Sequence, residues 1–209
     1  MSERIGIFGG SFNPVHCGHL ILAQDALEHM GLARVVFVPA AQPPHKPAVP
    51  LAPPGDRLEM LRLAVAGDPR FEVSDEEIRQ GGISYTVDTL RRFRANHPDA
   101  APYFIIGGDS LRELHTWREI ETILTLAEIV TIARPGVDLG RLDAATLRLP
   151  DPWPARLAAN CVMGHLVEIS STDIRGRVAR GRSIRYLVPD AVERYIQRMN
   201  LYDRQETVR

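Results

Sequence analysis

Cysteine is scarce in this chain, and the segments that mark an exported or membrane-spanning protein are missing. The two cysteines, Cys17 and Cys161, provide neither a disulfide framework nor a Cys-x-x-Cys pair for zinc or redox chemistry. No stretch reaches the roughly 18 to 20 consecutive apolar residues that cross a membrane. The N-terminus also lacks the apolar region and cleavage site of a secretory signal. These absences predict a cytoplasmic protein.

An excess of charge of one sign is missing as well. The formal net charge is −1, from 25 basic and 26 acidic residues, and no charged block or low-complexity tract occurs. A chain held on nucleic acid or on an acidic membrane by its overall charge would be strongly basic. We therefore expect neither partner, while a homo-oligomer stays possible. The length and the 44% hydrophobic content suit one globular domain over residues 1–209.

Short apolar runs with strand character alternate with segments of helical periodicity. Strands are predicted at 4–8, 34–38, 71–74, 103–106, 128–133 and 165–169, and helices at 20–30, 56–66, 86–96, 117–126, 170–180 and 189–199. This alternation predicts an α/β fold with a mainly parallel sheet and helices on both faces, where ligands bind at the carboxyl ends of the strands. Residues 137–163 have the least regular pattern, and we expect a surface excursion there.

The first candidate site is the loop Gly9-Gly10-Ser11-Phe12, together with His16 and His19 at the start of the next helix. Paired glycines allow close backbone approach, and the N–H groups and dipole of a helix start favour phosphate. The three-residue spacing lets both imidazoles face one phosphate, while Gly18 leaves room for a nucleotide. A histidine pair can also simply cap a helix. Neither a zinc ligand set nor the dinucleotide signature Gly-x-Gly-x-x-Gly is present.

Three further places carry candidate ligand-binding residues. Ser171, Thr172 and Arg175 lie at another helix start and suit a second phosphate cradle, although a capped helix with a surface arginine is the alternative. Asp109 follows a strand and a glycine pair, where its carboxylate can bind ribose hydroxyls or cap the next helix. Trp117 can stack on a flat ring or belong to the core.

Together these segments resemble the His-x-Gly-His signature of the nucleotidyltransferase superfamily, in the form found in bacterial nicotinate-nucleotide adenylyltransferases. The resemblance covers nearly the whole chain, and six motifs occur in the family's order: 9–20, Pro44-His45-Lys46, Ile83-Ser84-Tyr85-Thr86, 104–109, His115-Thr116-Trp117 and 169–175. It implies a Rossmann-like fold. It also implies transfer of the adenylyl group of ATP to nicotinate mononucleotide in NAD biosynthesis, giving nicotinate adenine dinucleotide and pyrophosphate, with Mg²⁺ delivered by ATP.

The resemblance also implies roles for individual residues. Catalytic roles fall to four residues that act on the ATP phosphates: His16, His19, Lys46 and Arg175. Nucleotide or substrate binding falls to Gly9, Gly10, Ser11, Phe12, His45, Ser84, Tyr85, Thr86, Gly107, Asp109, Trp117, Arg134, Ser171 and Thr172. No protein side chain is expected to bind the metal. Arg118 departs from the family pattern, which often has an aromatic or neutral residue there.

Acceptor choice follows from the helix predicted to begin at Thr86. Its N–H groups and dipole favour an anion, so we expect nicotinate mononucleotide to be preferred over the neutral nicotinamide form. The alternatives are an adenylyltransferase for another phosphorylated acceptor such as phosphopantetheine, a nucleotide sensor without turnover, and a class I aminoacyl-tRNA synthetase. The chain is short for the last of these and has no Lys-Met-Ser-Lys-Ser loop.

Overall fold

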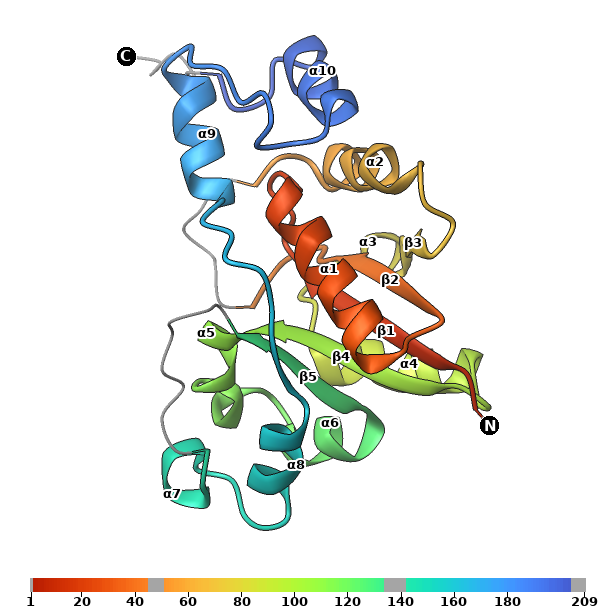
Figure 1. Ribbon diagram of the computed structural model, residues 1–209. Helices are drawn as coiled ribbons and strands as arrows, with labels where there is room; N and C mark the ends of the chain where they lie inside the picture. Colours follow the sequence, from red (N-terminus) through yellow and green to blue (C-terminus); the bar gives the residue numbers. More distant parts are fainter. Residues whose placement is uncertain (1, 45–50, 134–141, 204–209) are drawn as a thin grey trace.

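A single parallel sheet forms the centre of the molecule. The computed structural model describes residues 2–44, 51–133 and 142–203 (Figure 1). The strands are β1 (Arg4–Gly10), β2 (Arg34–Pro39), β3 (Phe71–Val73), β4 (Ala101–Gly107), β5 (Glu128–Ala133) and β6 (Cys161–Met163), in the spatial order β3-β2-β1-β4-β5-β6. The chain moves outward from β1 to β3 and then returns to the other side of β1 with β4. In sheets of this kind, ligands bind where the order reverses, which here is between β1 and β4.

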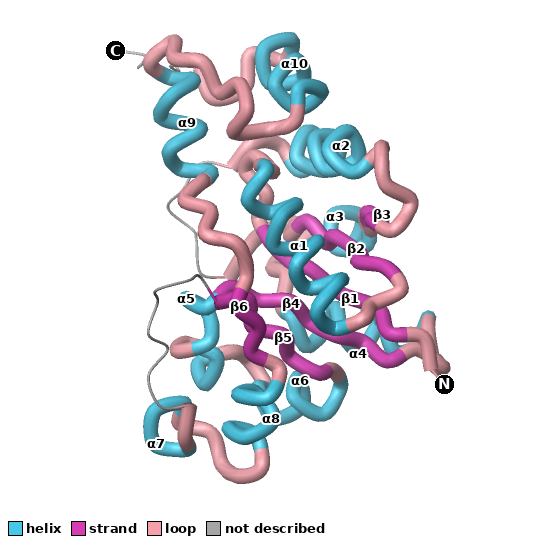
Figure 2. The backbone as a smooth tube through the Cα atoms, viewed as in Figure 1, coloured by secondary structure: helices cyan, strands magenta, loops and turns pink. Residues whose placement is uncertain are grey.

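Helices cover both faces of the sheet. They are α1 (Cys17–Met30), α2 (Pro54–Val65), α3 (Glu76–Gln80), α4 (Thr86–Asn96), α5 (Gly108–Leu111), α6 (Ile120–Leu126), α7 (Ala144–Leu147), α8 (Trp153–Ala159), α9 (Ser171–Ala179) and α10 (Asp190–Arg198), with a 3₁₀ helix η1 (Leu114–Thr116). Figure 2 shows α1 on one face of the sheet and α4 and α6 on the other. The predicted α/β class, parallel pairing and Rossmann-like arrangement are confirmed.

Alternation along the strands divides the core into two clusters. Phe37 packs into the cluster beneath α1, whereas its neighbour Val38 packs into the cluster beneath α4. Ile105 and Ile106 separate in the same way on β4. Successive side chains of a strand point to opposite faces, so a strand covered on both faces is apolar throughout. Each fully buried side chain of this size contributes about 1.5–3 kcal/mol to folding.

The strand predicted at 165–169 is wrong. The sixth strand, β6, lies just before it and pairs with β5, so residues 137–163 are not a mere excursion: they hold β6 as well as α7 and α8. His165 leaves the sheet because its backbone N–H donates to Asp25 Oδ2 at 2.8 Å instead of to a strand. Its ring Nδ1 lies 2.7 Å from Asp25 Oδ1. At Gly164, a Cβ would lie only 2.5 Å from Ile132 Cγ2, so the chain turns where only glycine fits.

The helix predicted at 117–126 begins three residues late. Trp117 is extended, with ψ 141°, and Glu119 adopts a left-handed conformation with φ 53°, so α6 starts at Ile120. Trp117 is thereby held on a connecting segment rather than inside a helix. The short elements α3, α5 and η1 were not predicted. All three are shorter than two full helical turns, too short for a periodic pattern to reveal.

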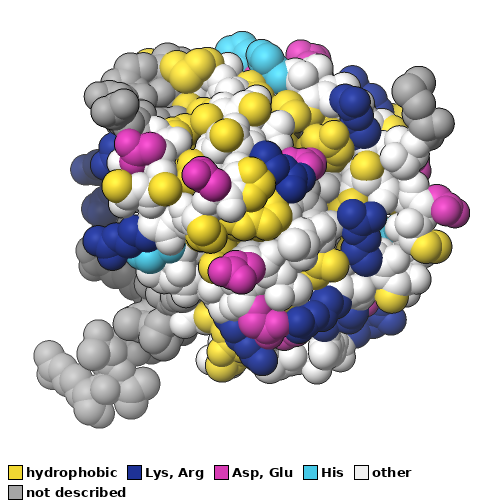
Figure 3. Space-filling model, turned by 90° about the horizontal axis from the view of Figure 1, so that it is seen from below, with side chains coloured by type: hydrophobic (Ala, Val, Ile, Leu, Met, Phe, Trp, Pro, Cys, Tyr) yellow, Lys and Arg dark blue, Asp and Glu magenta, His cyan; other side chains and the backbone are white. Residues whose placement is uncertain are grey.

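The surface carries mixed charges. Figure 3 shows a face on which basic and acidic side chains are interspersed with apolar ones. Within the described ranges, no helix is long and apolar enough to cross a membrane.

Candidate active site

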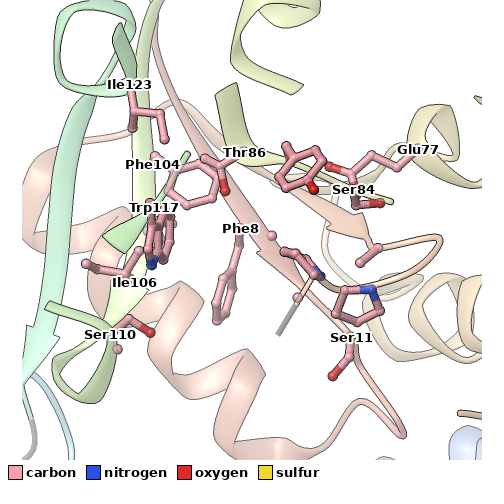
Figure 4. Close-up of a pocket in the computed structure, with 18 of the residues that line it drawn as sticks. Phe8, Ser11, Glu77, Ser84, Thr86, Phe104, Ile106, Ser110, Trp117 and Ile123 are labelled. Atoms are coloured by element: carbon pink, nitrogen blue, oxygen red, sulfur yellow. The ribbon is translucent and has the colours of Figure 1, made fainter. Parts of the chain in front are cut away.

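A cavity of about 630 Å³ lies at the carboxyl ends of β1 and β4, where the strand order reverses. Its floor is formed by the strand ends, including Phe8 and Phe104. Figure 4 shows Trp117 and Phe104 on one side of the cavity, Glu77 and Ser84 on the other, and Phe8 between them. Pockets for small molecules commonly measure about 300–1,000 Å³. The space therefore suits a ligand of nucleotide size.

Ten predicted site residues from distant segments meet at this cavity. They are Gly9, Gly10, Ser11, His19, Ser84, Tyr85, Thr86, Gly107, Asp109 and Trp117. Five others belong to the glycine loop, α1 or α9 but do not line it: Phe12, His16, Ser171, Thr172 and Arg175. His45, Lys46 and Arg134 lie outside the described residues. These positions do not test the binding role of any of the three groups, and those roles stay predictions.

The two histidines of the motif have different environments. His16 is the N-cap of α1 and only 6% exposed, and its ring stacks on that of His19 with 3.7 Å between centroids. The backbone N–H of His16 donates to His19 Nδ1 at 3.2 Å. Because Nδ1 accepts this bond, the neutral His19 ring carries its proton on Nε2, which is then a donor. Burial lowers the pKa of His16 to about 4, so its ring is uncharged at neutral pH.

The glycine between the histidines accommodates protein atoms. A Cβ on Gly18 would lie 3.0 Å from His16 Nδ1 and 3.3 Å from Val167 Cγ1. The sequence suggested that this space admits a nucleotide, but His16 and Val167 fill it. Gly18 thus lets the His16 ring and the segment after β6 pack closely against the start of α1.

The loop before these histidines is held from behind by side chains from distant segments. Arg175 Nη1 donates to the Asn13 carbonyl at 2.8 Å, and Ser171 Oγ donates to the Pro14 carbonyl at 2.9 Å. Thr172 Oγ1 accepts a 3.3 Å hydrogen bond from Arg175 Nη2. The start of α9, where the sequence predicts a phosphate cradle, therefore binds the backbone of the first motif.

Arg57 is a residue of this network that the sequence did not indicate. Its side chain is fully buried, and it donates to three carbonyls: Nη1 to Ser11 at 2.8 Å, Nε to Ala52 at 3.0 Å and Nη2 to Ala41 at 3.1 Å. Burial lowers its pKa, because desolvation disfavours the charged form. Arg57 joins the loops after β1 and β2 to the start of α2. Only its three-dimensional surroundings distinguish it from an ordinary helix arginine.

Glu77 on α3 is a second buried charged group that sequence reasoning missed. It lines the cavity, is 8% exposed, and accepts hydrogen bonds from the hydroxyls of Thr89 and Ser84. Ser84 Oγ in turn accepts from the Ala41 N–H at 2.9 Å. The Ser84 hydroxyl, predicted to contact a ligand, is thus engaged by protein groups. Burial raises the pKa of Glu77.

The start of α4 faces the cavity beside a cation. Tyr85 is the N-cap and makes no side-chain capping bond. Its carbonyl accepts the Asp88 N–H at 3.0 Å, so the N–H groups of Thr86 and Val87 are the ones that need other partners. The Arg118 guanidinium lies 4.6 Å from the centroid of the Tyr85 ring and is half-exposed, with Asp88 Oδ2 3.9 Å away. Trp117 meets Phe104 edge to face at 6.1 Å. A flat anionic group can therefore meet an aromatic face, helix N–H groups and a guanidinium here.

The family of the chain follows from comparison with known proteins. Residues 7–177 match the family described as cytidylyltransferase-like, so the fold and site define a nucleotidyltransferase. A probable nicotinate-nucleotide adenylyltransferase of Citrifermentans bemidjiense is 47% identical, covering 95% of this chain and 98% of its own. Another from Thermus thermophilus is 48% identical, covering 95% and 99%. This chain belongs to the nicotinate-nucleotide adenylyltransferase family.

Solved structures agree on the fold. The Plasmodium falciparum nicotinic acid mononucleotide adenylyltransferase complexed with NaAD matches with a TM-score of 0.73 at 19% identity, covering 96% of this chain and 97% of its own. The same enzyme complexed with APC gives a TM-score of 0.72 at 18% identity, covering 96% and 97%. At such low identity these matches establish the shared fold alone. The family resemblance seen in the sequence is confirmed by the sequence relatives.

Glu77→Gln is expected to stabilise the protein increasingly as pH rises. The folded-state pKa of Glu77 is raised above the ordinary value of 4.5, so stability is full below that value and is lost as pH rises through the folded pKa. The neutral glutamine avoids this loss. Calorimetric Tm values should therefore converge near pH 4 and separate by pH 7. Glu121→Gln, on the exposed side of α6, should show no such divergence, and a pH-independent Tm difference for Glu77→Gln would contradict a raised pKa of Glu77.

Proposed function

We propose that this cavity holds ATP and nicotinate mononucleotide together, and that the enzyme transfers the adenylyl group of ATP to the mononucleotide. The products are nicotinate adenine dinucleotide and pyrophosphate. This is the reaction for which its relatives are named. The observation that carries the proposal is that His19, the loop after β1 and Trp117 line one cavity at the reversal of strand order.

The transfer requires one displacement at phosphorus. A 5′-phosphate oxygen of the mononucleotide forms a bond to the α-phosphorus of ATP, while the bond from that phosphorus to the oxygen bridging toward the β-phosphate breaks. The electron pair leaves with pyrophosphate, and no covalent enzyme intermediate forms. Rate enhancement then depends on positioning and on donors aimed at developing negative charge. His19 Nε2–H, at the positive end of α1, is such a donor.

The ATP end of the cavity is assigned to the glycine loop and the end of β4. The Gly9 and Gly10 backbones lie against aromatic rings, since a Cβ there would be 3.2 Å from Phe104 and 3.1 Å from Phe12. Asp109 lines the cavity and is proposed to accept hydrogen bonds from the ribose hydroxyls. His45, Lys46, Arg134 and Arg175 are proposed to assist at the phosphates.

Magnesium is proposed to enter as part of the Mg-ATP substrate. Among the described residues, no group of three or more His, Cys, Asp or Glu side chains is placed to hold a metal ion. Mg²⁺ commonly keeps several waters and binds substrate phosphate oxygens. We therefore expect ATP phosphate oxygens and water molecules to be the ligands of the ion.

The acceptor end is assigned to Trp117 and the start of α4. Trp117 stacks on the pyridine ring, and the N–H groups of Thr86 and Val87, in the first turn of α4, bind its carboxylate. An amide would point its own hydrogens at these donors and leave them unpaired, at a cost of about 1–3 kcal/mol for each buried group. Arg118 adds a positive charge beside the same position.

His19→Ala is expected to lower kcat by about 10²- to 10³-fold, because one preorganised donor to the developing charge is lost. The measurement is pyrophosphate release with ATP and a panel of acceptors: nicotinate mononucleotide, nicotinamide mononucleotide, phosphopantetheine and none. Far-UV circular dichroism should stay unchanged. His29→Ala, in the last turn of the same helix, is the matched control and should keep wild-type turnover. Near-normal turnover by His19→Ala would remove His19 from the chemistry.

Acceptor choice is expected to separate into two effects. Wild type should prefer nicotinate over nicotinamide mononucleotide by about 10²-fold in kcat/KM if two donors are mismatched. Trp117→Ala should raise KM for both, since stacking does not depend on the carboxylate, whereas Arg118→Ala should reduce the preference itself. The arginine effect should weaken with added salt, because the side chain is half-exposed.

Arg79→Ala, an exposed arginine of α3 outside the cavity, is the control for a general charge effect. Equal use of both mononucleotides by wild type would contradict carboxylate binding at α4. An unchanged preference in Arg118→Ala would assign selectivity to the helix N–H groups alone.

Lys46 offers a direct test of the predicted ATP contact, because it is the only lysine in the chain. An amine-reactive acylating reagent can then modify one side chain besides the N-terminal amine. ATP should slow acylation of Lys46 several-fold, and nicotinate mononucleotide alone should not. Peptide mass spectrometry measures both amines, with the N-terminus as internal control. The same Lys46 rate with and without ATP would contradict its role.

A further inference from the structure

We propose that Tyr202, near the C-terminus, is a positioning residue for the ATP end of the site. Its hydroxyl fixes the side chain of Asn13, and thereby the loop that leads into His16 and His19. The inference rests on the proposed function of that loop. It assigns a role in turnover to a residue that does not line the cavity.

The contact between the two segments is direct and partly buried. Tyr202 Oη donates to Asn13 Oδ1 at 2.9 Å, and the same oxygen accepts the Ala52 N–H at 3.0 Å. Asn13 is 1% exposed. The Asn13 side chain is therefore held from two directions by residues 39 and 189 positions away in the sequence.

Tyr202 is suited to a fixed donor role. Its backbone has φ 66°, a left-handed conformation that costs energy for a residue other than glycine, so the surrounding structure must hold the segment in place. Its ring packs against the core cluster beneath α1. Burial is the main cause that raises the pKa of its hydroxyl, which stays a proton donor at any working pH.

Asn13 transmits this constraint along the chain. Its carbonyl accepts a hydrogen bond from Arg175, and His16 follows it by three residues. The bond from the His16 N–H to His19 Nδ1, 3.2 Å long, fixes the ring that we propose donates to phosphate. A shift of the loop at Asn13 therefore moves or reorients His19. Misplacement of reacting groups by about 1 Å can cost about 10²-fold in rate.

The acceptor end is held by hydrogen bonds other than the one between Tyr202 and Asn13. Ser84 is held by Glu77 and by the Ala41 N–H, and neither bond involves Asn13 or Tyr202. Loss of the Tyr202 hydroxyl should thus lower kcat/KM for ATP and weaken ATP binding, while the KM for the acceptor stays unchanged. A purely structural role would instead lower stability without distinguishing the two substrates.

The experiment compares Tyr202→Phe with Tyr195→Phe. Tyr195 also belongs to the C-terminal segment, is 8% exposed, and donates its hydroxyl hydrogen bond to Asp56, at 2.7 Å, instead of to a residue of the loop. Both variants lose one tyrosine hydroxyl. Tyr202→Phe should lower kcat/KM for ATP about tenfold at saturating nicotinate mononucleotide, within the range of a small misplacement. Tyr195→Phe should match wild type in kinetics while losing similar thermal stability.

Calorimetric binding of a non-hydrolysable ATP analogue supplies a readout besides turnover, and its Kd should rise in Tyr202→Phe only. In an Asn13→Ala background, Tyr202→Phe should have no further effect on either quantity. Equal behaviour of the two tyrosine variants, loss of the folded state in Tyr202→Phe alone, or an undiminished effect in the Asn13→Ala background would overturn the proposal. Absence of ATP binding or of transfer by wild type would instead refute the proposed function.

Discussion

The site depends on how the backbone between β1 and α1 is fixed. This loop follows the carboxyl end of the central strand β1, where strand pairing has ended. Its carbonyls and the Asn13 amide oxygen must therefore find partners elsewhere. Buried polar groups without partners are costly, and the protein meets this demand with two arginines, a serine and a tyrosine from outside the loop. This network holds the backbone that follows the glycine pair and leads into the two histidines.

Although the formal net charge of the chain is only −1, two ionisable side chains, Arg57 and Glu77, are buried close to the cavity. Arg57 is a buried cation bound only to carbonyls in the described ranges, and Glu77 is a buried acid bound by hydroxyls. Neither group relies on the surface ion pairs that are weak and screened by salt. Arg57 fixes the loops after β1 and β2 by hydrogen bonds, and Glu77, in the lining of the cavity, holds Ser84 and Thr89.

The sequence predicted two of the chain segments that border the cavity, because each is marked by residues that are neighbours in the sequence. A strand followed by glycines and a helix start identifies the loop at Gly9, and a helix beginning at Thr86 can be recognised from periodicity. The roles of Arg57, Glu77 and Tyr202 could not be predicted, since each depends on partners that the fold brings from other segments. The same reason explains the error at 165–169: apolar alternation indicates an extended chain, but Asp25, far away in sequence, decides that His165 leaves the sheet.

The hydrogen bonds from α9 and Tyr202 to the loop can form only late during translation. The glycine loop is synthesised before its partners, because Ser171, Arg175 and Tyr202 follow the loop residues that they bind by 157, 162 and 189 positions. Chains are made from the N-terminus at about 5–20 residues per second, so the loop waits on the order of ten seconds or more for these partners. During that interval a nascent chain can build most of its sheet before the loop has these hydrogen-bond partners.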